Sequence, residues 1–180
     1  MRAPELTTEK AELTLIAPDV ERDAPLSVGW LAGQPGRETL RLMGVTEADN
    51  QASSLDQERA RVRDFLERRD QLNWMLDLAG TVVGAIWVDL EPREQLPAPS
   101  VHLMIGDPAA RGQGLGGAAL RAVTGYLRST GSRSVYSRHT LENEASAGLL
   151  AACGFVPLGE AYQDSDGLHW QTVQRLERAG

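Results

Sequence analysis

Hydrophobic and polar positions recur along most of the chain with the periods of regular secondary structure, about two residues for strands and 3.6 for helices. The longest helical pattern covers Ser53–Arg69, where Val62 and Leu66 fall on one face. Ser54 and Gln57 have the spacing of a capping box at its start. Three further helices are predicted, a short one capped by Asp23 and ended by Gly33–Gly36, one over Gly114–Arg128, and one over Asn143–Phe155 with Asn143 as its N-cap.

Strand patterns fill the intervals between these helices. Asn73–Leu90 holds two β-rich runs on either side of Ala79–Gly80, which predicts a hairpin. Further strands are predicted at Glu12–Pro18, Ser100–Gly106, Ser132–Thr140, Phe155–Glu160 and Leu168–Leu176. The order β-α-α-β-β-β-α-β-α-β-β predicts an α/β fold with a mixed sheet and helices on both faces. We expect residues 1–180 to form one domain, a size that allows a sizeable core.

Composition narrows the class of protein. The chain is 42% hydrophobic and 24% charged, and no apolar run reaches the roughly 20 residues of a membrane helix. The N-terminus lacks the apolar segment of a secretory signal, and Cys153 is the single cysteine, so we expect a cytoplasmic protein with no disulfide and no metal site. A net charge of −7 argues against nucleic-acid partners and favours a cationic one. Oligomeric state is left open, a homodimer included.

The segment "GDPAARGQGLGGAAL" places five glycines within twelve residues, from Gly106 to Gly117, at the entrance of a predicted helix. Glycine is costly inside regular structure, so such a cluster indicates that the backbone itself is used. Bare N–H groups at a helix N-terminus form an anion site. The alternative is a turn that only caps the helix.

Two familiar phosphate loops fit this segment poorly. A P-loop requires a lysine after its last glycine, and the segment has none. Gly112, Gly114 and Gly117 do fit the dinucleotide pattern G-x-G-x-x-G. However, they follow a hairpin in mid-chain, and no acidic residue stands about 20 positions further on to bind a ribose.

A third pattern, R-x-x-G-x-G, is formed by Arg111, Gly114 and Gly116. On this motif the chain resembles the GNAT superfamily of acetyl-CoA-dependent N-acetyltransferases. A second segment, N-x-x-S at Asn143 and Ser146 followed by "LLAACGF", is similar to the N-x-x-S-x-x-L-x-x-x-x-G-F segment of that family. Many members carry a tyrosine at the position of Leu150. The form found here is more similar to the branch that acetylates ribosomal-protein N-termini and to some antibiotic acetyltransferases.

The resemblance implies a GNAT-type fold, with a mostly antiparallel sheet splayed at the cofactor strand and acetyl-CoA as co-substrate. It implies that backbone groups of Met104, Ile105 and Gly106 pair with the pantetheine arm, and that Asn143 and Ser146 also contact the cofactor. The diphosphate would be bound by the loop residues Arg111, Gly112, Gln113, Gly114, Leu115, Gly116 and Gly117. Arg111 would either contact the diphosphate or brace the loop.

Acetyl transfer to an amine requires a base for the amine, donors for the oxyanion and a proton for the leaving thiolate. His102, on the cofactor strand, is the first candidate for the base; the alternative is a histidine hydrogen-bonded within the sheet. The carboxylate alternatives for the base are Asp89, Asp107, which also suits a loop cap, and Glu142. Because Leu150 cannot donate a proton, Ser146 is the candidate acid, unless it serves only the helix start and the cofactor.

We therefore expect an enzyme that transfers acetyl from acetyl-CoA to a primary amine by direct attack on the thioester. The acceptor would be a protein N-terminus, a lysine, a polyamine or an aminoglycoside-like small molecule. The main alternative is a catalytically weak, CoA-binding regulatory module. A nucleotide-binding protein that uses the same glycines is a further alternative.

Overall fold

A computed structural model describes residues 3–93 and 95–176. The helices are α1 (Val20–Trp30), α2 (Gly33–Leu42), α3 (Leu55–Glu67), α4 (Leu115–Ser129), α5 (Glu144–Ala152) and a 3₁₀ turn, Pro108–Ala110. The strands are β1 (Leu6–Thr7), β2 (Leu13–Ile16), β3 (Gln71–Leu78), β4 (Thr81–Asp89), β5 (Ser100–Ile105), β6 (Ser134–Thr140), β7 (Val156–Pro157), β8 (Tyr162–Gln163) and β9 (His169–Leu176). The order agrees with the predicted one, with helix α2 and the short strands β1 and β8 added.

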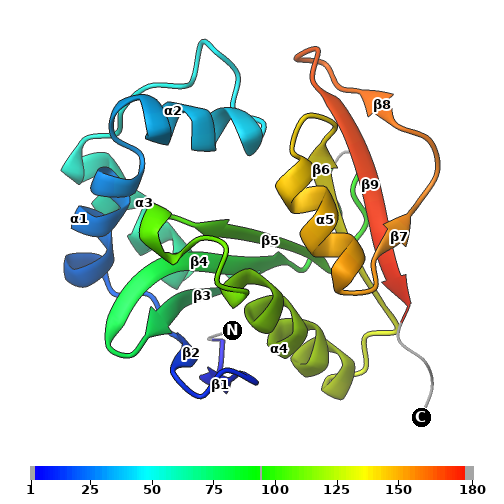
Figure 1. The fold of residues 1–180 in the computed structure, drawn as a ribbon, viewed down its shortest axis with the longest axis horizontal. Coiled ribbons are helices and arrows are strands. Elements are labelled where there is room, and N and C mark those ends of the chain that lie inside the picture. Colours follow the sequence, from blue (N-terminus) through cyan, green and yellow to red (C-terminus); the bar gives the residue numbers. More distant parts are fainter. Residues whose placement is uncertain (1–2, 94, 177–180) are drawn as a thin grey trace.

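The strands lie in the order β1-β2-β3-β4-β5-β6-β9-β7, and β8 pairs with β9 (Figure 1). Within the described residues, every neighbouring pair is antiparallel except β5 and β6. The prediction of a mixed, mostly antiparallel sheet is confirmed. The parallel pair is joined through α4, the crossover helix that such a pair requires.

Helices cover both faces of the sheet, as predicted. On one face α4 and the end of α5 pack on the main core, which includes Trp74, Ile86, Val101 and Leu120. On the other face α1 and α2 close two smaller clusters, around Met75 and around Met104 respectively, and α3 lies beside α1 (Figure 1). Because side chains alternate along a strand, residues 101, 103 and 105 of β5 face α4, whereas His102 and Met104 face α1–α3.

The two halves of the sheet separate at β5. This strand pairs with β4 along its whole length, from Ser100 to Ile105. With β6 it shares the single register pair Ser100↔Tyr136. The strands therefore diverge beyond Ser100, and the sheet is splayed at the strand predicted to hold the cofactor (Figure 1).

The start of the chain differs from the prediction in two places. Helix α1 is capped by Asp19, whose side chain accepts from the Arg22 N–H, and Asp23 lies fully buried one turn later. Asp23 accepts from the Asp19 N–H, so the two carboxylates cap the helix reciprocally. The segment Gly33–Gly36 begins a second helix instead of ending the first, because Pro35 is tolerated in a first helical turn.

Candidate active site

The glycine loop turns the chain from the 3₁₀ turn into α4. Gly112 and Gly114 adopt φ values of +73° and +75°, a conformation that suits glycine. Gly114 is the N-cap of α4 and offers no side-chain cap. The first helical hydrogen bond runs from the Ala118 N–H to the Gly114 carbonyl. The N–H groups of residues 115–117 therefore lie at the positive end of the helix without a helical acceptor, as an anion site requires.

Gly116 serves close packing as well. A Cβ at this position would lie 2.9 Å from Cδ2 of Leu103 and 3.2 Å from Cδ2 of Leu149. The absence of a side chain thus lets the first turn of α4 lie directly against β5 and α5. The helix terminus is held at the point where β5 leaves β6.

Arg111 braces the loop. Its Nε donates to the Ile105 carbonyl at 3.1 Å, and a terminal nitrogen donates to Oγ1 of Thr39 at 3.1 Å. The guanidinium thereby fastens the loop to β5 and α2. Of the two roles left open by the sequence, the structure shows bracing, and contact with a diphosphate stays a prediction.

Lys10 lies beside the loop although it is remote in sequence. A Cβ on Gly114 would stand 3.4 Å from Cε and 3.9 Å from Nζ of Lys10. Lys10 is the only lysine of the chain, and it adds a positive charge next to the helix terminus. No local pattern in the sequence pointed to it.

Backbone groups of β5 face the space between β5 and β6. The Val101 carbonyl accepts from the Ser137 hydroxyl at 2.8 Å, and the Ile105 carbonyl accepts from Arg111. Because these groups alternate along a strand, Leu103 also presents its N–H and C=O to this side. The Gly106 N–H, in contrast, donates to the Val83 carbonyl on β4. Ile105 and Leu103 are thus the best-placed backbone partners for an added extended chain, and sequence reasoning missed Leu103.

Asn143 joins α5 to α2 across the opening. Its Oδ1 accepts from the Ser146 N–H at 3.0 Å, which confirms the predicted N-cap. Its Nδ2 donates to the Leu42 carbonyl at 3.0 Å. Helix α2 therefore bridges the two halves of the sheet, since it contacts Arg111 on one side and Asn143 on the other. Ser146 is partly exposed at the start of α5.

His102 lies on the sheet face opposite α4, with 21% of its side chain exposed. Its Nε2 is 3.2 Å from Oδ2 of Asp89, and its ring stacks on Trp87 with a centroid distance of 5.4 Å. Burial opposes ionisation of Asp89, but hydrogen bonds from His102 and Gln71 outweigh it, so the pKa of Asp89 lies below its ordinary value. An ionised carboxylate accepts only, which places the imidazole proton on Nε2 and leaves Nδ1 as the basic atom.

The other candidate carboxylates are engaged elsewhere. Oδ1 of Asp107 accepts from the Ala109 N–H at 2.9 Å and caps the 3₁₀ turn, as its loop-cap alternative predicted. Glu142 forms an exposed ion pair with Arg41. Leu150 is buried in the core, 5% exposed. Among the candidate carboxylates, Asp89 is the one that the fold places beside His102.

Residues 3–93 and 95–176 contain neither a candidate metal site nor a candidate membrane helix. No group of three or more histidine, cysteine, aspartate or glutamate side chains is arranged there to hold a metal ion. In the same ranges, no helix has the length and apolar character needed to cross a membrane.

Comparison with known families decides the class of the protein. The model of the GNAT acetyltransferase domain matches residues 13–156. The chain belongs to the GNAT acetyltransferase family. The match includes the glycine loop, the splayed strand and the N-x-x-S segment, and the predicted family is confirmed. A sequence search against curated proteins gives no match.

Solved structures share the GNAT fold. RimL, a ribosomal L7/L12 α-N-protein acetyltransferase in complex with coenzyme A, superposes with a TM-score of 0.75 at 15% identity, over 95% of this chain and 97% of its own. The acetyltransferase from Salmonella typhimurium that modifies the N-terminal serine of L7/L12 gives 0.74 at 17% identity, over 94% and 97%. The microcin C7 self-immunity acetyltransferase MccE, in complex with acetyl-CoA and AMP, gives 0.72 at 11% identity, over 92% and 93%.

Proposed function

We propose that this GNAT protein transfers the acetyl group of acetyl-CoA to a primary amine by direct attack on the thioester. The proposal is carried by the fact that two possible cofactor contacts, the edge of β5 and the N-terminus of α4, lie side by side. Beyond Ser100 the edge of β5 pairs with no further residue of β6, and it lies next to the glycine-lined terminus of α4, so one extended molecule can use both. Its diphosphate would contact the N–H groups of residues 115–117. Its pantetheine arm would lie along Leu103 and Ile105 as an added strand.

His102 is proposed as the base. The acceptor amine must lose a proton before attack, since a lysine-like ammonium has a pKa of about 10.4. With its proton on Nε2 and directed to Asp89, the imidazole accepts through Nδ1, directly or through a water molecule. Asp89 acts through His102 as a positioning residue. It fixes the tautomer and stabilises the imidazolium that forms.

The oxyanion and the leaving group would be served by strand β5 and by the start of helix α5, on the two sides of the opening. An N–H on β5 beside Met104, that of Ile105, faces the opening and would donate to the thioester oxygen as it gains charge. Ser146, at the start of α5 on the other side, is proposed to protonate the thiolate. A water molecule is the alternative donor, because a thiol of pKa about 8.5 needs little assistance at neutral pH.

A cationic amine suits the acceptor side. The chain carries a net charge of −7, and His102, Asp89 and Met104 face the helices α1–α3 and not the cofactor helix. The structural neighbours include enzymes that act on a ribosomal-protein N-terminus. A protein N-terminus, a lysine, a polyamine and an aminoglycoside-like amine are the acceptor classes proposed here. A regulatory module that binds CoA without turnover is the alternative, based on Leu150 at the usual tyrosine position.

The test measures thiol release from acetyl-CoA with a panel of peptides, polyamines and aminoglycosides, together with CoA binding by calorimetry. Release of CoA with formation of the acetylated amine supports the enzyme. Tight CoA binding without release on the whole panel supports the module. Thermal stabilisation by ATP or NAD but not by CoA overturns both, because selective ligands stabilise the folded state.

A further inference from the structure

The turn between β1 and β2 brings a positive charge to the glycine loop, and hydrogen bonds within the turn define where that charge can reach. The Lys10 N–H donates to the hydroxyl oxygen of Thr8 at 3.1 Å, and the Lys10 carbonyl accepts from the Leu13 N–H at 2.9 Å. Threonine hydroxyls commonly stabilise turns through such contacts with the backbone. The main chain of Lys10 is therefore held on both sides, so the point from which its side chain extends is defined.

An ion pair fastens this turn to α4, beside the start of that helix (Figure 1). The Arg121 guanidinium donates to the Glu9 carboxylate through Nε, at 3.1 Å, and through a terminal nitrogen. These hydrogen bonds hold the pKa of Glu9 below its ordinary value, so the pair is charged at neutral pH. The Arg121 side chain runs back toward the helix N-terminus, since a Cβ on Gly117 would lie 3.2 Å from one of its terminal nitrogens.

Lys10 carries the positive charge that remains after this pairing. Glu9 is engaged by Arg121, and among the described residues the Lys10 ammonium has no ion-pair or hydrogen-bond partner of its own. Its Nζ would stand 3.9 Å from a Cβ on Gly114, the N-cap of α4. An ammonium on a flexible four-carbon stem is a point charge that suits phosphate oxygens. The fold thus places one uncompensated cation beside the proposed diphosphate site.

We propose that Lys10 binds a phosphate group of coenzyme A, and that the Glu9–Arg121 pair is the positioning element that holds Lys10 in reach of it. The inference rests on the proposed function, which puts the diphosphate at residues 115–117. Its possible partners, the diphosphate and the 3′-phosphate of the coenzyme, share the same chemistry, that of anionic phosphate oxygens. The turn precedes residues 13–156, the segment that matches the GNAT model, so the matched motifs do not include it.

Three ligands measure this contact on the full chain: CoA, 3′-dephospho-CoA and pantetheine, which carries no phosphate. Lys10→Met is expected to weaken CoA binding about three- to fivefold in calorimetry, the size of one exposed charge contact. Pantetheine binding, followed by amide NMR, should not change. Equal weakening for CoA and 3′-dephospho-CoA assigns Lys10 to the diphosphate, whereas weakening confined to CoA assigns it to the 3′-phosphate.

The positioning role is tested with double variants that keep the net charge. Glu9→Met with Arg121→Met removes the ion pair, and CoA binding is expected to weaken about two- to fivefold. Lys10→Met added to that protein should cause little further loss, because both changes act on one contact. The exchange of Glu9→Arg with Arg121→Glu restores a pair of opposite sense and should recover most of the affinity.

Failure of this inference differs from failure of the proposed function. A wild-type chain that binds no CoA contradicts the proposed function itself. If the wild type binds CoA and Lys10→Met binds it equally well, or loses pantetheine affinity to the same degree, the phosphate contact is wrong. Normal affinity in the neutral double variant, full additivity with Lys10→Met, or no recovery in the charge exchange overturns the positioning role.

Discussion

Nε2 of His102 stands 3.2 Å from Oδ2 of Asp89 on the neighbouring strand, while Oδ1 of the same carboxylate accepts from Gln71 at 2.6 Å. Both oxygens are thus engaged, and the carboxylate cannot turn away from the imidazole. Residues from β3, β4 and β5 meet in this contact because the register places them side by side. The carboxylate of Asp89 therefore fixes the orientation of the His102 ring.

Replacement of His102 by Gln is expected to lower kcat by about 100-fold or more, the usual contribution of a general base. CoA affinity should be unchanged, because the imidazole and the α4 terminus lie on opposite faces of the sheet. Steady-state kinetics at neutral pH, together with calorimetry, would check both statements. Unchanged turnover would remove His102 from the mechanism.

Asn143 provides a stability test that separates its two contacts. Asn143→Ala removes the cap of α5 and should lower the free energy of unfolding by about 1 kcal/mol. Asn143→Ser keeps a capping oxygen but cannot reach Leu42, so it should recover most of that loss. Urea denaturation measures both variants. If serine is as destabilising as alanine, the bridge to α2 and not the cap determines stability here.

The sequence predicted those parts of the candidate site whose conformation depends on single residues and their close neighbours in the chain. The glycine cluster from Gly106 to Gly117 indicated that the backbone itself is used at a helix entrance, and Asn143 indicated a helix start, because these signals come from the residues themselves. The prediction failed at Gly33–Gly36, where turn-forming residues begin α2. Contacts from distant segments, Arg111 to Thr39 among them, support that helix, and no local pattern contains them.

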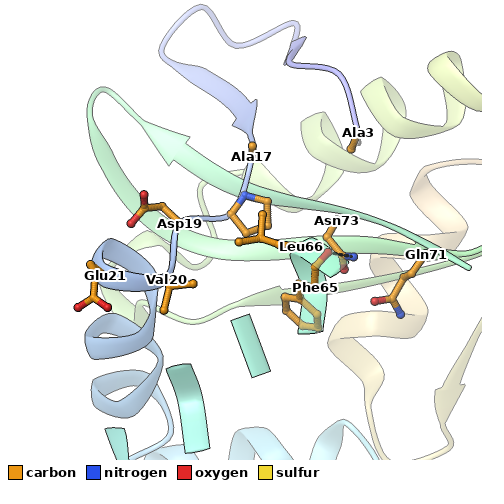
Figure 2. Close-up of a pocket in the computed structure, with 10 residues that line it drawn as sticks. Ala3, Ala17, Asp19, Val20, Glu21, Phe65, Leu66, Gln71 and Asn73 are labelled. Carbon is orange, nitrogen blue, oxygen red and sulfur yellow. Dashed lines mark hydrogen bonds between the residues drawn. The ribbon is translucent and has the colours of Figure 1, made fainter. Parts of the chain in front are cut away.

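The same limit explains the missed residues. Lys10 comes to the glycine loop from the N-terminal hairpin, a contact that depends on β1 and β2 joining the sheet edge. Gln71 and Asn73 resemble ordinary strand residues in the sequence, and only the fold shows that both are almost fully buried, at the edge of a pocket beside α3 (Figure 2). Backbone N–H and C=O groups point to alternate sides along β5. Only the register with β4 shows that those of Leu103 and Ile105 point away from β4, toward the opening.

Acid stability should depend on Asp70. Two hydrogen bonds from the Arg68 guanidinium lower the pKa of Asp70 to about 2, from 3.8 in the unfolded chain. A carboxylate that is more acidic when folded stabilises the protein above the unfolded value, and this contribution is lost as the pH falls from about 4 to about 2. Asp70→Asn should flatten the stability–pH curve in that window. Asp56→Asn, at a side chain 95% exposed, is the matched control for the loss of one surface carboxylate.

Lys10→Met should weaken CoA binding about three- to fivefold, the size of a single solvent-exposed charge contact. The loss should shrink at high ionic strength, since salt screens the same interaction. Lys10→Arg retains the charge and should bind CoA nearly as the wild type does. Salt-independent weakening in Lys10→Met would show that the side chain acts through packing, and its assignment to the diphosphate would be wrong.

Gly114→Glu is the strictest test of the cofactor site. The new carboxylate would stand beside the terminus of α4 and next to Lys10, so it should repel the diphosphate and neutralise the nearby cation. CoA binding is expected to fall by about 100-fold or more. Gly114→Asn is the uncharged control, because asparagine adopts positive φ more readily than other side chains. It measures the free-energy cost of a side chain in this backbone conformation, about 1–2 kcal/mol at most. Gly125→Glu adds the same charge further along α4, where a Cβ meets no atom within 4 Å, and should bind CoA normally. If Gly114→Glu is folded and binds CoA as tightly as these controls, the diphosphate lies elsewhere and the acetyl-transfer site must be sought away from this loop.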